Sequence, residues 1–191
     1  MQTQEIKKLP TEVINQIKAG EVVEKPANVV KELVENSIDA KATQITVELL
    51  DGGKRLIQVS DNGSGIPKDK LFLALERHTT SKITQTKDLD NLSSFGFRGE
   101  ALASIVSVSH FSVKSKTEKE ETGFEINCQA GVKTNEQLTI MENGTVIQVK
   151  DLFNCVPARL KFLKTTSTEF THIQEFLTAS AFYYFHIGFK L

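Results

Sequence analysis

The chain has 191 residues, a formal net charge of −1 and an ordinary globular composition, with 39% hydrophobic and 25% charged residues. This length suffices for one domain with a sizeable core, or for one domain and the start of another. The near-zero net charge excludes a global basic field that would attract nucleic acid, so any such site must be local or lie outside this chain.

The sequence carries no sign of export or of membrane insertion. Its two cysteines, Cys128 and Cys155, form no CxxC pair, and we expect both to be reduced and buried as small apolar residues. The N-terminus lacks an apolar signal region, and no hydrophobic run is long enough to cross a bilayer. These features predict a cytoplasmic protein without a membrane partner.

Hydrophobic periodicity and turn signals predict alternating groups of helices and strands. In chain order they are helix 10–18, helix 26 to 39 or 40, strands 44–50 and 55–60, helix 68–77, helix 100–107, strands 108–113 and 123–128, a loop or edge strand at 131–142, strand 144–150, helices 158–164 and 168–182, and the start of a strand at 186–191. Because the strands come mostly as neighbouring hairpins, this order predicts an α+β two-layer sandwich. Its sheet is mixed and mostly antiparallel, with helices on one face.

The stretch Glu32-Leu-Val-Glu-Asn-Ser-Ile-Asp39 carries the most chemistry. Glu32 and Asn36 lie four residues apart and share one face of the predicted helix. An amide oxygen can ligate Mg²⁺, and a carboxylate one turn away can take a proton from an attacking water. Glu35 lies about 100° away from Asn36 around the helix, so we favour Glu32 as the partner. A solvated polar helix face is the alternative, and it would prevail if this motif stood alone.

A second motif, Asp61-Asn-Gly-Ser-Gly65, ends the predicted strand 55–60. The Asp61 carboxylate can accept a hydrogen bond from an exocyclic amine such as that of adenine. Gly63 and Gly65 allow a sharp turn or a close approach to a ligand. An acidic turn that needs glycine for its geometry is the alternative. The chain contains neither the dinucleotide-binding fingerprint nor a P-loop.

The long segment from residue 78 to 99 shows weak periodicity, which is typical of a lid, a binding loop or disorder. Gly96 and Gly99 lead into the predicted helix that follows, where free backbone N–H groups can bind an anion. Thr80 and Ser81 add hydroxyl groups that can donate to phosphates. These residues therefore predict the phosphate side of a nucleotide site.

In combination the motifs resemble a known superfamily. Glu32-x-x-x-Asn36, Asp61-x-Gly-x-Gly65, a loop ending in Gly96-x-x-Gly99, and Gly144-Thr145 are similar, in this order, to the four nucleotide-binding motifs of the GHKL ATPases. That superfamily includes DNA gyrase, heat-shock chaperones, histidine kinases and the MutL mismatch-repair proteins. Two further runs, Gly96-Phe-Arg-Gly-Glu-Ala-Leu102 and residues 16–40, resemble the signature and the N-terminal block of the MutL family. The resemblance covers essentially the whole chain.

The resemblance implies a role for each matching residue. Glu32 would be the general base that activates water, and Asn36 would ligate Mg²⁺. Asp61 would read the adenine amine, Gly63 and Gly65 would let the base approach, and Thr145 would help to form the adenine pocket. The lid that closes over the phosphates of ATP would comprise Thr80, Ser81, Gly96, Phe97, Arg98, Gly99, Ala101 and Leu102.

The implied function is an ATP-binding and slowly hydrolysing module. Lid closure would drive homodimerisation and relay a mismatch signal from a MutS-type recognition protein to strand-processing factors. The alternatives are a nucleotide-gated interaction module with negligible turnover, or another GHKL ATPase such as a type II topoisomerase subunit. The resemblance also implies an ATPase domain at 1–185 and the first residues of a truncated second subdomain at 186–191.

DNA is a further implied partner, bound weakly and mostly through regions absent here. Arg159, Lys161 and Lys164 could contribute to this binding, and a solvated basic helix face is the alternative. The chain departs from the family where it reads Leu152-Phe-Asn-Cys-Val-Pro-Ala-Arg159, because Cys155 occupies the usual asparagine position. We expect this departure to affect only the local turn.

Overall fold

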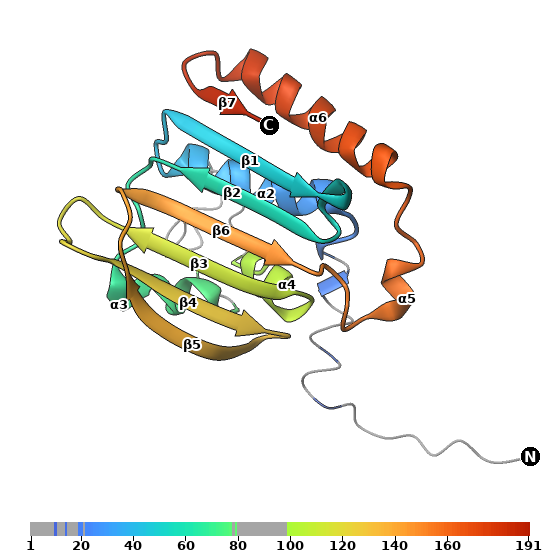
Figure 1. Ribbon diagram of the computed structural model, residues 1–191, viewed down its shortest axis with the longest axis horizontal. Coiled ribbons are helices and arrows are strands. Elements are labelled where there is room, and N and C mark those ends of the chain that lie inside the picture. Colours follow the sequence, from blue (N-terminus) through green and yellow to red (C-terminus); the bar gives the residue numbers. More distant parts are fainter. Residues whose placement is uncertain (1–9, 11–13, 15–18, 21, 78, 80–98) are drawn as a thin grey trace, which may run out of the picture.

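The chain folds around one mixed, mostly antiparallel sheet (Figure 1). The computed structural model describes residues 10, 14, 19–20, 22–77, 79 and 99–191. Within this part of the chain, seven strands lie in the order β5 (Val132–Thr139), β4 (Gly123–Gln129), β3 (His110–Lys116), β6 (Gly144–Lys150), β2 (Leu56–Asp61), β1 (Gln44–Leu50) and β7 (Gly188–Lys190). Neighbouring strands are antiparallel except β1 and β7, which are parallel. This arrangement confirms the predicted sheet type.

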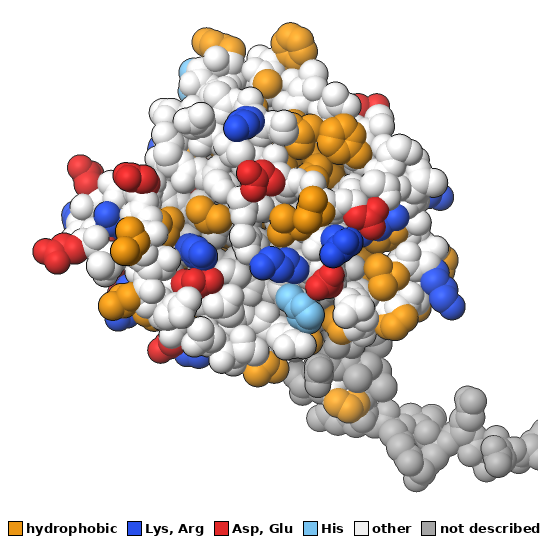
Figure 2. Space-filling view, viewed as in Figure 1, with side chains coloured by type: hydrophobic (Ala, Val, Ile, Leu, Met, Phe, Trp, Pro, Cys, Tyr) orange, Lys and Arg blue, Asp and Glu red, His pale blue; other side chains and the backbone are white. Residues whose placement is uncertain are grey.

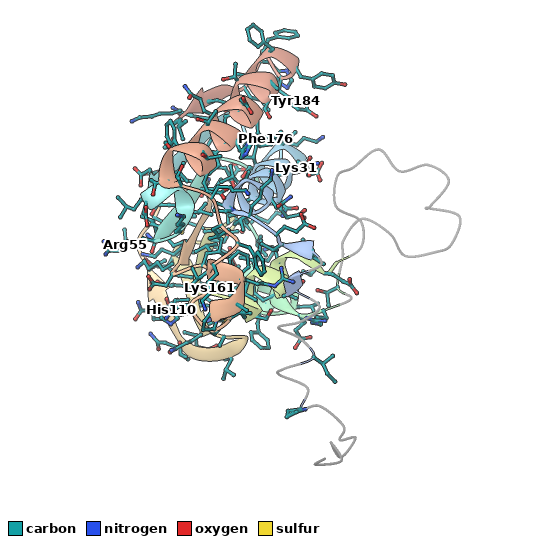
Figure 3. All side chains as sticks on the ribbon, turned by 90° about the vertical axis from the view of Figure 1, so that its right-hand side faces the viewer. Lys31, Arg55, His110, Lys161, Phe176 and Tyr184 are labelled. Carbon is teal, nitrogen blue, oxygen red and sulfur yellow. The ribbon has the colours of Figure 1, made fainter. Side chains whose placement is uncertain are left out.

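The helices lie mainly on one face of the sheet, as predicted. They are α2 (Pro26–Asp39), α3 (Lys68–Leu71), α4 (Ala101–Ser107), α5 (Pro157–Leu160) and α6 (Thr166–Tyr183), with short 3₁₀ turns η1 (Asp51–Gly53) and η2 (Leu73–Leu75). Figures 1 and 3 show α2 and α4 behind the sheet and α6 along its β1–β7 edge. Among the described helices, none combines the length and the hydrophobicity that a membrane span requires.

The core lies between the helices and the inner face of the sheet. Helix α2 begins at Pro26, which suits a first helical turn, and the Asn28 side chain accepts a hydrogen bond from the Lys25 N–H at 3.1 Å. The helix buries the apolar stripe that its periodicity predicts, at Val29, Val30, Leu33 and Val34. Alternate strand residues meet this stripe and its neighbours from the sheet: Ile45, Val47, Ile57, Val59, Phe111, Val113, Ile147 and Val149. Each fully buried side chain of this kind contributes roughly 1.5–3 kcal/mol.

The outer face of the sheet is polar. Hydrogen bonds join side chains across adjacent strands: the Gln148 amide donates to Gln58 at 2.6 Å, and Ser112 and Gln137 both donate to the Glu125 carboxylate, at 3.2 and 3.0 Å. Such cross-strand pairs stabilise an exposed sheet face. Figure 2 shows basic and acidic side chains interspersed on this face rather than gathered by sign. Figure 3 shows His110 on the same side.

Two predicted helices are shorter than expected. The segment predicted as one helix over 68–77 divides into α3 and η2, and the Thr79 hydroxyl lies 2.7 Å from the Leu73 carbonyl and 2.8 Å from the Glu76 carbonyl at its end. The segment predicted as a helix over 158–164 forms only the single turn α5. The predicted helix 10–18 lies mostly outside the described residues.

One burial prediction is wrong. Cys128 is buried, but Cys155 is exposed. The turn after β6 buries Leu152 and Phe153 instead, and the chain then runs outward, so that the Cys155 Sγ contacts the Ser107 carbonyl at 3.6 Å. At the C-terminus, β7 joins the sheet through β1, as the predicted strand start requires, and the boundary at residue 185 stays a prediction.

Candidate functional site

Helix α2 carries the first predicted pair of site residues. Because residues 26–39 form one continuous helix, Glu32 and Asn36 lie on the same side of it, and both are half-buried. The Glu35 Oε1 lies 3.8 Å from Lys31 Nζ. The choice of Glu32 over Glu35 as the partner of Asn36 stays a prediction.

The Asp61 carboxylate lies at the end of β2, against the C-terminal part of α2. Its Oδ2 accepts a hydrogen bond from the Ser37 hydroxyl at 2.7 Å, and its Oδ1 accepts one from the Gly63 N–H at 2.9 Å. Burial raises the pKa of Asp61 above its ordinary value, and hydrogen bonds from Ser37 and from the backbone N–H groups of Gly63 and Thr145 offset part of this rise. The fold therefore holds one carboxylate in a fixed orientation where α2, β2 and β6 meet.

Strand register places Thr145 beside this carboxylate. Thr145 is the residue of β6 opposite Asp61 in β2 and opposite Ser115 in β3. Only 7% of its surface is exposed, and its hydroxyl lies 3.0 Å from the Ser115 hydroxyl. Two motifs separated by more than eighty residues of sequence are thus brought together by the pairing of β2 with β6.

Gly65 is required by the packing of the turn that follows β2. Its φ of +70° lies in the left-handed region, and a Cβ at this position would lie 2.2 Å from the Lys116 carbonyl oxygen. Glycine here lets the turn approach the end of β3. A second role, in which Gly63 and Gly65 give a base access to the site, stays a prediction.

The predicted lid is described in part. Thr80, Ser81, Gly96, Phe97 and Arg98 lie outside the described residues. Gly99 lies against Thr79, because a Cβ on Gly99 would be 2.5 Å from the Thr79 carbonyl oxygen. Ala101 and Leu102 begin α4, which packs against α2. The described ends of the predicted lid therefore lie side by side.

Two serines of the site were not predicted. Ser37 directly follows Asn36 on the helix, and a polar residue one position from a predicted ligand was a usable signal. Ser115 continues the alternation of Phe111 and Val113 on the inner face of β3, but the predicted strand ended at residue 113 and left it out. A polar residue in an apolar alternation marks a buried hydrogen bond.

The predicted basic residues have different surroundings. The Arg159 guanidinium donates from Nη1 to the Gly20 carbonyl at 2.7 Å, so it holds the chain near its N-terminus against α5. Lys161 and Lys164 are exposed. A role for these residues in DNA binding stays a prediction.

Two hollows on the surface lie away from the predicted site. One, of about 780 Å³, lies between η1 and the start of α6 and is lined by Asp51, Gly52 and Phe170 among others. The other, of about 380 Å³, is lined by Phe72 and Phe124 among others. Neither contains a predicted site residue, so the chemistry of Asp61 and Asn36 is the better guide to a ligand.

Gly144, at the start of β6, offers a test of this packing. Its φ is +129°, and a Cβ would lie 2.0 Å from the Asp61 carbonyl oxygen. Gly144→Ala is expected to lower the free energy of unfolding by about 2–4 kcal/mol, because β6 must move away from β2 or adopt a strained backbone. Chemical denaturation measures this loss. Gly188→Ala is the control, since a Cβ there meets nothing closer than 3.7 Å and stability should hardly change.

The arrangement presents two groups that a ligand could contact. Asp61 is a hydrogen-bond acceptor held in a fixed orientation. Asn36 has an amide oxygen, a type of group that hard cations prefer, and its role as a ligand stays a prediction. Among the described residues, no group of three or more His, Cys, Asp or Glu side chains is placed to hold a metal by itself. A cation here would take most of its ligands from the phosphates and water.

Comparison with known proteins agrees with this chemistry. Residues 24–156 match the family model of histidine kinase-, DNA gyrase B- and HSP90-like ATPases. The chain is 50% identical to the DNA mismatch repair protein MutL of Pelodictyon phaeoclathratiforme over 186 residues, which cover 97% of this chain and 30% of that protein. It is 51% identical to MutL of Halothermothrix orenii over 187 residues, covering 98% of this chain and 29% of that protein. The chain thus spans less than a third of the length of these relatives.

Solved structures show the same fold. The Aquifex aeolicus MutL ATPase domain complexed with ADP superposes with a TM-score of 0.74 at 38% identity, covering 88% of this chain and 59% of that one. The N-terminal domain of a DNA repair protein superposes with a TM-score of 0.78 at 31% identity, covering 92% and 50%. The chain therefore belongs to the family of histidine kinase-, DNA gyrase B- and HSP90-like ATPases, and it corresponds to the ATPase region of MutL proteins.

Proposed function

We propose that this chain is the ATP-binding and slowly hydrolysing module of a MutL-type DNA mismatch repair protein. The observation that carries this function is the Asp61 carboxylate, half-buried and held by hydrogen bonds from Ser37, Gly63 and Thr145. A fixed acceptor of this kind suits the exocyclic amine of adenine. Further support comes from the 38% identical Aquifex aeolicus domain, whose structure is complexed with ADP.

The work of the site divides among its elements. Asp61 and Thr145 would bind the adenine at the ends of β2 and β6. Asn36 would offer its amide oxygen to Mg²⁺, and the ion when bound would neutralise phosphate charge. Glu32, one turn before Asn36 on α2, would accept the proton of the attacking water. The lid would close over the phosphates through Thr80, Ser81, Gly96, Phe97, Arg98, Gly99, Ala101 and Leu102.

At the level of the whole protein, ATP binding would act as a conformational switch. When the lid closes over nucleotide, a segment of the chain becomes ordered, and a partner protein can bind to the ordered surface. We propose that it promotes homodimerisation and relays a signal from a MutS-type mismatch-recognition protein to strand-processing factors. Weak contact with DNA would come mostly from parts of the protein beyond these 191 residues. The support for these roles is the near 50% identity with MutL proteins over almost the whole chain.

Equilibrium binding of a non-hydrolysable ATP analogue, with and without Mg²⁺, tests this function. Calorimetry on the 191-residue chain should show binding that strengthens with Mg²⁺. Asn36→Ala removes the amide oxygen proposed to ligate the ion, so its affinity for the analogue in the presence of Mg²⁺ should fall at least about tenfold. Asn135→Ala, on the exposed edge strand β5, is the matched control and should bind as the wild type does. If neither this chain nor a longer MutL-type chain containing it binds the analogue, the ATPase function must be abandoned.

A further inference from the structure

We propose that Ser115 determines the base specificity of the nucleotide site by fixing the direction of the Thr145 hydroxyl proton. The inference rests on the proposed nucleotide-binding function and deepens it. Ser115 belongs to none of the four nucleotide-binding motifs. Its position would make Thr145 a hydrogen-bond acceptor and so favour a base that presents an amino group there.

Ser115 is buried at the junction of three chain segments. It is 1% exposed and lies on the inner face of β3. Its Oγ accepts a hydrogen bond from the Ile66 N–H at 2.7 Å and lies 3.0 Å from both the Gly144 carbonyl oxygen and the Thr145 Oγ1. One hydroxyl therefore joins the turn after β2, the strand β3 and the start of β6.

The supply of protons decides how these contacts are made. A serine hydroxyl has one hydrogen to donate and two lone pairs that accept. The Gly144 carbonyl can only accept, so it takes the Ser115 proton, and the Ile66 N–H uses one of the two lone pairs. The contact with Thr145 then forms only if Thr145 donates. This is the arrangement in which all three contacts are satisfied, as buried polar groups generally are.

The consequence is a pocket end that accepts hydrogen bonds. The Thr145 proton is directed at Ser115, so Thr145 would offer a ligand only lone pairs, and the register pairs Thr145 with Asp61 across β6 and β2. An amino group carries two hydrogens and can satisfy two acceptors. A carbonyl at the same place can satisfy neither. Adenine presents the amino group, whereas hypoxanthine, otherwise closely similar in shape, presents the carbonyl.

The test compares the dissociation constants of ADP and inosine diphosphate, since these two ligands require no hydrolysis. Wild-type chain should prefer ADP. In Ser115→Ala the Thr145 proton is released and can serve a carbonyl, so the preference for ADP should fall about fivefold to tenfold. Ser112→Ala is the matched control, because Ser112 is a buried serine of the same strand that faces the opposite side and donates to Glu125. It should keep the wild-type preference.

A double-mutant cycle separates this effect from a general loss of stability. If Ser115 acts through Thr145, then Ser115→Ala should change the preference no further in a Thr145→Val background. Ser115→Cys has a similar shape but forms weaker hydrogen bonds, so it should lower the preference for ADP over inosine diphosphate with less effect on the stability of the fold. Ser115→Thr keeps the hydroxyl and should retain this preference.

The outcomes distinguish this inference from the function on which it rests. Wild-type binding of ADP with an unchanged preference in Ser115→Ala and Ser115→Cys, even with weaker binding of both ligands, would overturn the role of Ser115 alone. Additive effects in the cycle would overturn it as well. Failure of both the wild-type chain and a longer MutL-type chain containing it to bind either nucleotide would overturn both this inference and the nucleotide function of the chain.

Discussion

Asp61→Asn is expected to weaken ADP and ATP binding severely while the chain stays folded. The substitution keeps the size of the side chain but exchanges a charged acceptor for an amide that turns either a weaker acceptor or an N–H₂ group toward the adenine amine. Loss of this charge-assisted hydrogen bond, with an amine left unsatisfied, should weaken binding by at least about a hundredfold, or about 3 kcal/mol. Calorimetry with ADP measures the change.

The same variant has an expected effect on stability that makes the binding result interpretable. Burial raises the pKa of Asp61 above its ordinary value of 3.8. Between that value and the higher folded-state pKa, the folded chain holds a proton that the unfolded chain has released, so the contribution of Asp61 to stability falls as pH rises through this window. An asparagine does not ionise and avoids this cost. Asp61→Asn should therefore resist denaturant at pH 7 at least as well as the wild type, and its advantage should shrink near pH 4.

Asp69→Asn is the control for the binding result. Asp69 is an exposed residue of α3, and its replacement should leave ADP binding unchanged. Chemical denaturation of Asp61→Asn and of the wild type at several pH values measures the expected change in stability. If Asp61→Asn instead unfolds far more readily than the wild type at pH 7, the carboxylate is a structural requirement of the fold, and its loss says nothing about adenine.

Local patterns in the sequence were sufficient to predict most elements of this fold. The alternation of apolar and polar residues in β1 and β2 determines which side chains face the core, and Asp51-Gly-Gly, a sequence typical of hairpin turns, joins the two strands. The stripe on α2 predicts its buried face in the same way. These features depend on residues close in sequence, because the spacing of apolar residues along one helix or strand indicates which of its faces is buried.

The order of the strands depends on contacts that no local pattern records. Strand β6 inserts between β3 and β2, two strands that precede it by roughly thirty and ninety residues, and β7 pairs in parallel with β1. Cys155 shows the same limit on a smaller scale. Its apolar character predicted burial, but in this turn Leu152 and Phe153 are the residues that enter the core, and the cysteine is exposed.

The candidate site divides along the same line. Glu32, Asn36 and Asp61 could be named as candidates because each lies in a compact motif with a recognisable chemistry. Ser37 and Ser115 carried weaker signals, their positions beside Asn36 and in an apolar alternation, and their contacts with Asp61 and Thr145 depend on the fold. A residue that orients another leaves a weak trace in sequence, because any buried hydroxyl with the right neighbours could do the same work.

Glu32→Gln is expected to separate hydrolysis from binding. Removal of a general base lowers the rate of hydrolysis by about 10²–10⁴-fold, whereas glutamine preserves the shape of the site and should leave the affinity for ATP nearly unchanged. Single-turnover hydrolysis and calorimetry with the same preparation measure the two quantities. Glu35→Gln is the matched control: it lies on the same helix, its carboxylate pairs with Lys31, and its loss should alter neither quantity.

The comparison of Glu32→Gln with Asn36→Ala also decides what drives the proposed switch. If ATP binding alone promotes dimerisation, Glu32→Gln should dimerise in the presence of ATP, while Asn36→Ala stays monomeric. The Glu32→Gln dimer should also last longer than the wild-type dimer, because this variant hydrolyses ATP more slowly. If both variants stay monomeric although Glu32→Gln binds ATP, the switch requires turnover, and the chain works as an enzyme rather than as a nucleotide-gated binding module. Light scattering with ATP and with ADP measures the fraction of dimer and distinguishes a binding-driven switch from one that requires turnover. A binding-driven switch gives dimer with ATP even in a variant that does not release phosphate.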